Sequence, residues 1–337
     1  MSANKSFNLP QWAHFLELLS GEPKNTSPWK KRLVMDVSIP ISGILIFLVL
    51  WAGIASQIQT SLGTLPGPSQ VFNQAIVLWE DHQQERVKEE KFYERQEKRN
   101  AKKLEKNPDA KIKVRDYTGK ETFIDQIFTS IFTVLTGFIL ASLIAIPVGI
   151  VCGMSTVIYK ALNPFIQIFK PVSPLAWLPI VTMVVSAVYV SEDPTFSKSF
   201  INSAITVLLC SLWPTIINTT VGIANVDQDL LNVGKVLRLG WFDRIFKILI
   251  PSSIPMMFAG LRVSLGIGWM VLIAAEMLAQ NPGLGKFVWD EFQNGSSNSL
   301  ARIMVAVFVV GFIGFLLDRA ILSLQKLLSW DKNAVIR

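Results

Sequence analysis

The sequence predicts an all-α integral membrane protein with about six transmembrane helices. Three observations support this fold class. Of the 337 residues, 50% are hydrophobic and only 17% are charged, against about 25% charged in ordinary soluble domains. Much of the charge gathers between Glu80 and Glu121. The rest of the chain holds apolar runs of the ~20 residues that a helix needs to cross a bilayer. A soluble globular enzyme and a disordered chain are excluded.

The apolar runs give the predicted spans. They are Ile39–Ser56, Ile127–Met154, Phe165–Val190, Phe200–Ala224, Ile254–Ala279 and Ala301–Leu322. Each should be helical, because backbone inside a bilayer must satisfy its own hydrogen bonds. Pro171, Pro174 and Pro179 should interrupt regular helix in the third. The chain then divides into a segment 1–36, a first transmembrane helix 37–56, an insert 57–126, a core of five transmembrane helices 127–325, and a tail 326–337.

The distribution of Lys and Arg orients the spans. Basic residues cluster before the first span, after the second, between the fourth and fifth, and after the last. All four clusters are cytoplasmic if both termini are cytoplasmic, as the positive-inside rule favours. We therefore expect a multi-pass protein in a lipid bilayer, the bacterial inner (plasma) membrane. Within 1–36, apolar residues from Trp12 to Leu19 predict an interfacial helix, with packing on a partner subunit as the alternative.

The insert 57–126 is expected on the extracytoplasmic side. Val71, Phe72, Ala75, Ile76 and Trp79 form one predicted apolar face of a helix, as their spacing shows. From Glu80 the pattern is charged on every side, and the helix should end near Asn107. A helix that is polar all round is solvated or contacts a partner. The charged helix is therefore either a spacer or a docking surface for an extracytoplasmic protein.

No motif for catalysis or for a bound cofactor is present. None of the three Gly-Lys pairs is followed by the Ser or Thr of a phosphate-binding loop. His14 and His82 lie far apart, and Cys152 and Cys210 sit in separate apolar runs, so a metal site is not expected. Basic residues at span ends are typical of membrane proteins. We expect no catalytic residue, no metal, no cofactor on this chain and no nucleic-acid partner.

Polar residues inside the spans are the candidates for a transport pathway, because ionisable groups at membrane depth are rare and costly. Arg262 and Glu276 share a face of the fifth span but lie about 21 Å apart along it, so they cannot pair. Lys170 precedes the proline-broken stretch, whose backbone must be covered by protein or water. The tentative pathway set is Lys170, Ser173, Trp177, Asn218, Thr219, Arg262 and Glu276. Contacts between neighbouring helices are the alternative for each.

The segment 225–251 lies between the fourth and fifth spans, on the expected cytoplasmic side. Leu230, Val233 and Leu237 recur on one helical stripe, which Gly240 should end. A second helix should start at Phe242. A helix, a turn and a second helix would form a knob that could fit a groove on another protein.

This segment resembles the EAA loop of binding-protein-dependent ABC importer permeases. That loop reads E-A-A-x-x-x-G, then nine residues, then I-x-L-P. Asn232, Val233 and Gly234 take the E-A-A positions and Arg238 takes the glycine, while the closing motif ends at Pro251. The glutamate and the glycine are therefore absent, and the spacing is kept.

Three further stretches resemble the same family. They are Ser130–Gly153, Asn163–Pro179 and Phe258–Met277, and the similarity runs from about Val37 to the C-terminus. It is closest to the nitrate, bicarbonate and cyanate permeases of cyanobacteria, with the nitrate permeases first. The insert around Lys91–Lys120 resembles that subgroup specifically.

The resemblance implies a type I ABC importer permease fold and a subunit that pairs with a second copy around one route. Two cytoplasmic ATPase subunits, identical or not, would hold ATP and Mg, and an extracytoplasmic substrate-binding protein would complete the transporter. The implied ATPase-coupling residues are Asp229, Asn232, Val233, Gly234, Leu237, Arg238, Gly240, Trp241 and Phe242. The expected substrate is a small inorganic anion, nitrate first. Bicarbonate, cyanate, a sulfonate or taurine, and a stand-alone carrier or channel remain open.

Overall fold

The computed structural model describes residues 38–60, 63–107, 112, 114–190, 196–296 and 298–328. These residues form helices and one short hairpin, so the predicted all-α membrane fold is confirmed apart from that hairpin. The elements are α3 (Ile39–Ala55), β1 (Gln59–Thr60), β2 (Gly63–Thr64), α4 (Pro68–Lys106), α5 (Phe123–Met154), α6 (Thr156–Phe169), α7 (Pro174–Val188), α8 (Lys198–Ala224), α9 (Gln228–Val236), α10 (Trp241–Arg244), a π-helical turn (Ile245–Leu249), α11 (Ile250–Ala279), α12 (Leu284–Asn294) and α13 (Ser299–Leu328). The predicted interfacial helix near Trp12 lies outside the described residues.

Among these residues, four helical stretches are long and apolar enough to cross a membrane: α5, α8, the continuous run Trp241–Ala279, and α13. The pair α6 and α7 would make a fifth, bent by 101° at its break. α3 is apolar but only 17 residues long. The third span was predicted to start at Phe165, which is too late. α5 ends at Met154, and the Ser155 hydroxyl immediately caps the next helix by accepting from the Ile158 N–H.

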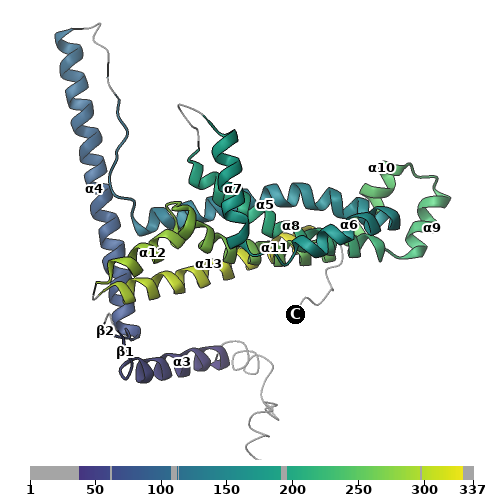
Figure 1. Ribbon diagram of the computed structural model, residues 1–337, viewed down its shortest axis with the longest axis horizontal. Coiled ribbons are helices and arrows are strands. Elements are labelled where there is room, and N and C mark those ends of the chain that lie inside the picture. The colour runs from purple at the N-terminus through teal and green to yellow at the C-terminus, as the bar shows by residue number, and fades with distance from the viewer. Residues whose placement is uncertain are drawn as a thin grey trace, which may run out of the picture.

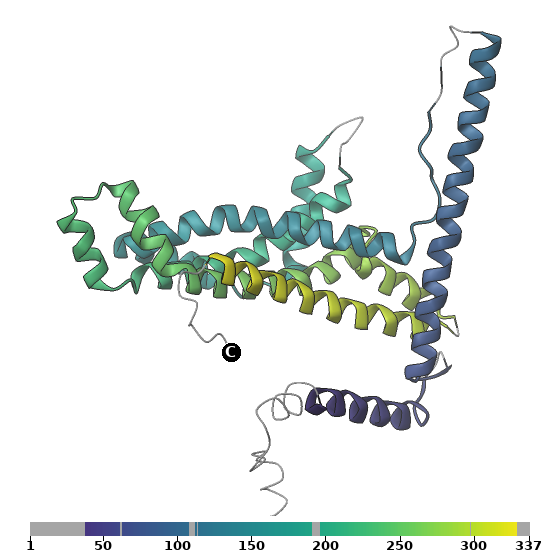
Figure 2. The ribbon, with the colours of Figure 1, turned by 180° about the vertical axis from the view of Figure 1, so that it is seen from behind.

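The long helices α5, α8, α11 and α13 run side by side (Figures 1 and 2), and α4 crosses one end of this bundle. α9 and α10 lie at the opposite end, and α7 projects from the side. We call the two ends of the bundle the α4 end and the α9 end. The expected charged insert and the expected coupling loop are thus separated by the full length of the bundle.

Small side chains let α5 and α8 approach closely. Gly137, Ala141, Ala145, Gly149 and Gly153 recur every four residues on α5, so they lie on one face. A Cβ added at Gly149 would lie 2.6 Å from the Thr219 Cβ, and one at Gly137 would lie 2.6 Å from the Ala204 carbonyl oxygen. Backbones pack this closely in membranes where glycine and alanine line the contact. The seam fixes α5 against α8 along most of its length.

Only part of the predicted apolar face of α4 is buried against the bundle: Val71 is buried and Ala75 packs against the core. Val71, Leu78 and Glu85, which recur every seven residues, are its buried positions. Phe72 and Trp79 are exposed, at 68% and 51%. The apolar pattern could not distinguish the two faces because both are apolar in the first turns. Seven-residue spacing keeps the buried face in line along the bundle end.

Candidate functional site

The loop at the α9 end has a helix–turn–helix form, but its turn lies earlier than predicted. α9 ends at Val236, and Gly240 starts α10 as its N-cap instead of ending α9. The Leu239 N–H donates to the Gly234 carbonyl at 3.0 Å, and the Arg238 N–H donates to the Lys235 carbonyl at 3.0 Å. This is the Schellman arrangement that ends many helices. It places Arg238 in the left-handed region, at φ 49°.

Position 238 is where the EAA pattern has its glycine. Glycine adopts a left-handed conformation without steric cost, whereas other residues lose about 1–2 kcal/mol there. The backbone at Arg238 thus adopts a turn that glycine would adopt without this cost. Gly234 is also confined, because a Cβ there would lie 2.7 Å from the Ile248 side chain.

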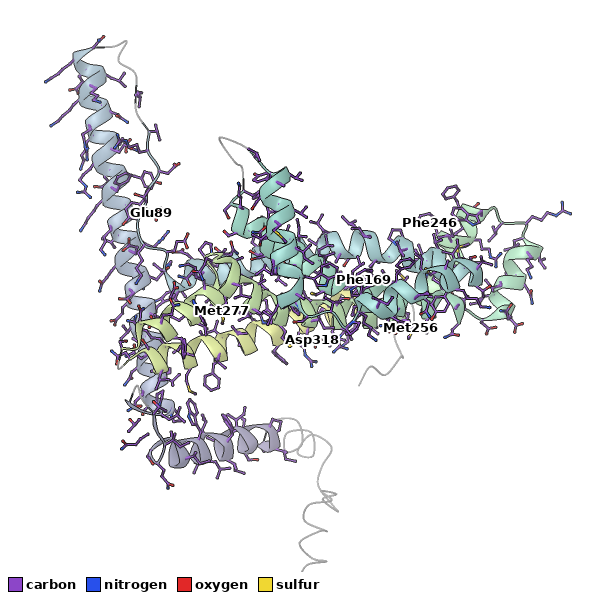
Figure 3. All side chains as sticks on the ribbon, viewed as in Figure 1. Glu89, Phe169, Phe246, Met256, Met277 and Asp318 are labelled. Atoms are coloured by element: carbon purple, nitrogen blue, oxygen red, sulfur yellow. The ribbon has the colours of Figure 1, made fainter. Side chains whose placement is uncertain are left out.

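Apolar side chains project from this loop into the surroundings. Val236 is 82% exposed, Leu237 64%, Trp241 57% and Phe242 70%. Phe246 is also exposed, and Figure 3 labels it on the upper side of the α9 end, next to α10. We call these five residues the apolar knob. An exposed patch of this kind marks an interaction site, and a buried cluster of Ile223, Val226, Ile245 and Leu249 anchors it to the bundle.

A pocket of about 350 Å³ opens between the end of α5, α6 and α8. We call it the α6 pocket. Five of its lining residues form one stripe along α6, at spacings of three or four: Thr156, Tyr159, Asn163, Gln167 and Lys170. Thr220 contributes from α8, and Asn225 is the C-cap residue of that helix. Among the described residues, its lining includes no Asp or Glu. Of the tentative pathway residues, Lys170 alone lines this pocket.

The tentative pathway residues Ser173, Trp177, Asn218 and Thr219 do not line the α6 pocket. The Ser173 hydroxyl caps α7 by accepting from the Leu175 N–H at 3.3 Å. Trp177 packs its ring against Phe169 at 5.8 Å. On α8, Asn218 donates to the Pro214 carbonyl at 2.9 Å. Thr219 contacts α5 through Gly149. These contacts are the helix-to-helix and capping roles that were the alternative to pathway lining.

Arg262 forms an ion pair with a neighbouring helix, which was the alternative to pathway lining, although its partner was not predicted. Its Nε lies 2.8 Å from Oδ1 of Asp318 and its Nη2 3.1 Å from Oδ2, a two-point contact that joins α11 to α13. Asp318 also contacts Arg319, at the longer distance of 3.8 Å. Two parallel hydrogen bonds hold a guanidinium in a fixed orientation. Arg262 thus has its own counterion within the bundle.

Glu276 is fully buried and holds three helices together. The Ser130 hydroxyl on α5 lies 2.8 Å from both carboxyl oxygens, and the Gly285 N–H in the first turn of α12 donates to one of them at 3.0 Å. Ser130 also accepts from the Leu284 N–H at 2.8 Å. Glu276 itself belongs to α11. An acidic group suits the N-terminus of a helix, where N–H groups lack partners. We call this group of contacts the Glu276 clasp.

A second pocket, of about 290 Å³, lies at the α4 end between α4, α5, α12 and α13. We call it the α4 pocket. Its lining carries both charge signs, namely Asp81, Glu85, Glu121, Asp290 and Glu291 with Lys88, Lys120 and Arg302. Most of these acids have a cation: Glu85 has Lys88 at 3.0 Å and Glu291 has Arg302 at 3.1 Å. Burial raises the pKa of Glu121, and Lys286 opposes that rise.

The fold and the loop at the α9 end define a membrane transport subunit, and comparison with known proteins agrees. A family model described as "Binding-protein-dependent transport system inner membrane component" matches residues 145–329. The chain belongs to this family, the permease subunits of ABC importers. Such subunits are transport components without catalytic activity, and the chain is one of them.

Within the family the chain falls in the nitrate and bicarbonate subgroup. It is 41% identical, over 60% of its length and 69% of the relative, to a nitrate import permease of Synechococcus elongatus. It is 35% identical, over 89% of its length and 91% of the relative, to a bicarbonate transport system permease of Synechocystis. A chain of the MetNI methionine ABC transporter superposes with a TM-score of 0.53, covering 61% of this chain and 96% of that one. At 10% identity this likeness shows the type I permease fold only.

The polar stripe of α6 is the feature that sequence reasoning missed. The signal was present, since Thr156, Tyr159, Asn163, Gln167 and Lys170 recur at helical spacing between apolar residues. It was hidden because the third span was taken to start at Phe165, which left the first three positions in a loop. A helix boundary moved by nine residues thus concealed an amphipathic helix.

Proposed function

We propose that this chain is the permease subunit of an ATP-driven importer of a small inorganic anion, and that the anion is nitrate. The observation that supports nitrate is the 41% identity to a nitrate import permease over 204 residues. Import would proceed by alternating access, a two-state change of the bundle biased by nucleotide binding elsewhere.

Bicarbonate is the second candidate, and the extent of similarity favours it. The bicarbonate permease relative aligns over 303 residues, or 89% of the chain, whereas the nitrate relative aligns over 60%. A 303-residue alignment must include much of the insert 57–126, since the chain outside that insert has only 267 residues. The percentage identity therefore favours nitrate, and the share of the chain that is covered favours bicarbonate.

The partners we propose are a second copy of the chain, two cytoplasmic ATPase subunits that hold ATP and Mg, and an extracytoplasmic binding protein. The apolar knob supports the ATPase contact, because all five of its side chains are more than half exposed next to an anchored turn. Its neighbours Asp229, Asn232 and Val233 lie on the exposed side of α9 and would complete the contact. The α9 end and both termini would be cytoplasmic, in the inner membrane.

The charged part of α4 is proposed as the docking surface for the binding protein. α4 crosses the bundle end farthest from the knob (Figure 1), where an extracytoplasmic protein would approach. Its exposed faces carry charges of both signs. Residues 114–122, which we call the return segment, are hydrogen-bonded along it. Gln96 exchanges two hydrogen bonds with the backbone of Arg115, at 2.9 and 3.2 Å. A brace of this kind keeps a long charged helix in a fixed position.

Uptake by the reconstituted transporter tests the proposal. The chain is assembled with its own ATPase and binding-protein subunits in liposomes, with ATP on the ATPase side. We expect accumulation of [15N]nitrate that requires ATP, with little competition by bicarbonate or cyanate. ATP-dependent uptake of [14C]bicarbonate instead would support the second candidate. Flux of either anion through liposomes holding this chain alone would contradict an ATP-driven permease and support a carrier or channel.

A knob variant tests the coupling part separately. Trp241→Ala should abolish the ATP hydrolysis that substrate-loaded binding protein stimulates, while the chain still inserts and binds its second copy. Leu143→Ala is the matched control, because Leu143 is a 67% exposed apolar residue on α5, away from the knob. Equal effects of the two substitutions would contradict a specific role of the knob.

A further inference from the structure

The middle of α8 has a break in its backbone hydrogen bonding. Pro214 lies inside the helix and has no N–H, so the link from residue 214 to the carbonyl of Cys210 cannot form. The next N–H, that of Thr215, donates to the Ser264 hydroxyl of α11 at 3.1 Å. Its ordinary acceptor in an α-helix, the Ser211 carbonyl, receives the hydroxyl hydrogen of Ser264 at 2.6 Å. One link of α8 is thus absent, and the next passes through a side chain of another helix.

The Ser264 hydroxyl fits this gap with all of its hydrogen-bonding capacity in use. It has one hydrogen, which goes to the Ser211 carbonyl, and it accepts from both the N–H and the hydroxyl of Thr215, the latter at 2.7 Å. All three residues are at most 1% exposed. A side chain inserted between the N–H and the carbonyl of a helix is one of the causes of a sharp bend.

Small residues of α11 hold the two helices together at the break. A Cβ added at Gly260 would lie 3.1 Å from the Pro214 carbonyl oxygen, and one at Gly268 would lie 2.6 Å from the Ser211 hydroxyl. Gly260, Ser264 and Gly268 recur every four residues, so they form one row along the face of α11. This row keeps the Ser264 hydroxyl within reach of the α8 backbone.

Two buried hydroxyls close to the break have no hydrogen-bond partner among the described residues. They are Oγ of Ser211 and Oγ1 of Thr219, and both residues are fully buried. An unsatisfied polar group in a protein interior is costly and needs a physical reason. Both groups lie within about one turn of Pro214, so a different bend of α8 changes what they face. A segment with two conformations, which satisfy different polar groups, accounts for them.

The break divides α8 into two segments with different neighbours in the chain. The segment 198–210 follows α7, whereas the segment 215–224 leads into α9 and the apolar knob. A buried cluster joins the end of α8 to the π-helical turn behind the knob, and its members are Ile223, Val226, Ile245 and Leu249. A displacement of the knob therefore reaches the segment 215–224 first.

We propose that residues 211–215 form a hinge in α8, which we call the α8 hinge, and that Ser264 is its positioning residue. The segment 215–224 swings with the apolar knob, while the segment 198–210 stays in place on its neighbours. The Ser264 hydroxyl allows this bend because it keeps the Thr215 N–H and the Ser211 carbonyl paired in a buried site. The force on the knob rests on the proposed function, in which partner subunits bind nucleotide.

Spin labels at the two ends of α8 test the hinge. The full transporter, with Cys152→Ala and Cys210→Ala, carries one label per copy, at Ala224→Cys or at Lys198→Cys, both exposed positions. A change of about 20° in the bend moves Ala224, which lies about 15 Å beyond Pro214, by about 5 Å. On trapping of ATP with vanadate, we expect the distance between the two copies to shift by about 5 Å or more at 224. The distance at 198 should stay unchanged.

Variants of two buried serines on α11 make the test specific. Ser264→Ala should abolish the shift at 224, because the Thr215 N–H can then bond directly to the Ser211 carbonyl and straighten the helix. Ser264→Thr keeps a hydroxyl and should retain the shift. Ser253→Ala is the matched control, since the buried Ser253 hydroxyl donates one turn back along its own helix, to the Leu249 carbonyl at 2.6 Å. It should leave the shift intact.

Pro214→Ala gives a second test that leaves Ser264 in place. It restores the missing N–H of α8 and should reduce the shift at 224. Equal shifts at 224 and 198, no shift at 224, or a shift that survives both Ser264→Ala and Pro214→Ala would each overturn the hinge. Because the distances need nucleotide and no anion, a transporter that moves at 224 but accumulates neither nitrate nor bicarbonate would refute the proposed function and retain the hinge.

Discussion

The α6 pocket and the α4 pocket have similar volumes, about 350 and 290 Å³, but the charged residues in their linings differ. The α4 pocket contains acids and bases that largely neutralise each other, as Glu291 and Arg302 do at 3.1 Å. The α6 pocket contains one cation, Lys170, and no acid among its described residues. The two pockets therefore differ not in volume but in whether the charged residues of the lining have partners.

The same difference extends to the polar groups around each pocket. Near the α4 end, Glu276, Ser130 and the first turn of α12 satisfy one another. At the α9 end, apolar side chains of the knob are exposed and Arg238 has a strained backbone. We infer that the α4 end supplies stability and that the α9 end is built for contacts outside this chain. The predictions below test that division.

The largest effect is expected at the Glu276 clasp. Glu276→Ala removes a fully buried carboxyl group and leaves the Ser130 hydroxyl and the Gly285 N–H without their acceptor. Loss of these bonds together with the cavity should cost about 3–5 kcal/mol. The unfolding temperature of the purified transporter should then fall by roughly 6–20 °C, taking about 2–4 °C per kcal/mol. Thermal unfolding in detergent measures it.

Two variants sharpen this result. Ser130→Ala should cost less, about 1–2 kcal/mol, since the carboxyl keeps the Gly285 N–H. Lys170→Met, at the unpartnered cation, should leave the unfolding temperature within about 2 °C, because no protein contact is lost. If Lys170→Met destabilised the chain as much as Glu276→Ala, the contrast between the partnered Glu276 and the unpaired Lys170 would be wrong.

The next effect is expected at the ion pair between α11 and α13. Asp318→Asn leaves Arg262 without its counterion and should cost about 2–3 kcal/mol, discounted because both side chains are about one-third exposed. The double variant Asp318→Asn/Arg262→Gln should recover part of the loss, since no lone charge remains. Thermal unfolding of the three proteins measures the coupling. An additive double variant would mean that the pair contributes no interaction energy.

Most of the fold could be predicted from the sequence, because apolar length alone identifies spans in a bilayer. The helix boundaries that were predicted wrongly depend on single capping residues. The Ser155 cap starts α6 one residue after α5, and a single-residue turn leaves no loop for composition to detect. The seam of Gly137, Ala141, Ala145, Gly149 and Gly153 was visible in the sequence as small residues four apart. The helix that packs on this seam, α8, could not be predicted, because any helix could pack there.

The sites were less predictable, because partners in space are not encoded by spacing. Arg262 and Glu276 were correctly excluded as partners of each other by helix geometry. Their real partners, Asp318 and Ser130, are 56 and 146 residues away in sequence. Lys170 was singled out from its proline-rich context alone. The polar stripe of α6 to which Lys170 belongs could not be recognised, because the sequence pattern did not locate the start of that helix.

A smaller, stabilising effect is expected at the turn of the α9 end. Arg238→Gly should relieve the left-handed strain at φ 49° and stabilise the chain by about 1 kcal/mol. Arg238→Ala removes the same guanidinium but keeps the strain, so it should give no gain. Thermal unfolding distinguishes the two. A gain from alanine equal to that from glycine would assign the effect to the lost charge and not to the backbone.

The smallest effect is expected in the insert, where the return segment contacts α4 through Tyr117. Its hydroxyl donates to Glu85 at 2.7 Å, and the Lys120 N–H donates to the same carboxyl at 3.2 Å. The hydrogen bond from Tyr117 lowers the pKa of Glu85 below 4.5, and the same bond raises the pKa of Tyr117 above 10.0.

These shifts fix the pH range of the contact. A lowered carboxyl pKa gives stability that is present above pH 4.5 and lost as the pH falls through the lower, folded value. A raised phenol pKa gives stability that is present below pH 10.0 and lost as the pH rises through the higher value. Spin labels at Glu90→Cys and Val114→Cys, in a chain with Cys152→Ala and Cys210→Ala, should report a constant, narrow distance distribution between these limits. Tyr117→Phe should broaden the distribution at pH 7, while unfolding of the bundle stays unchanged. A distribution that changes with pH near neutrality in the wild type would show that other groups hold the return segment to α4.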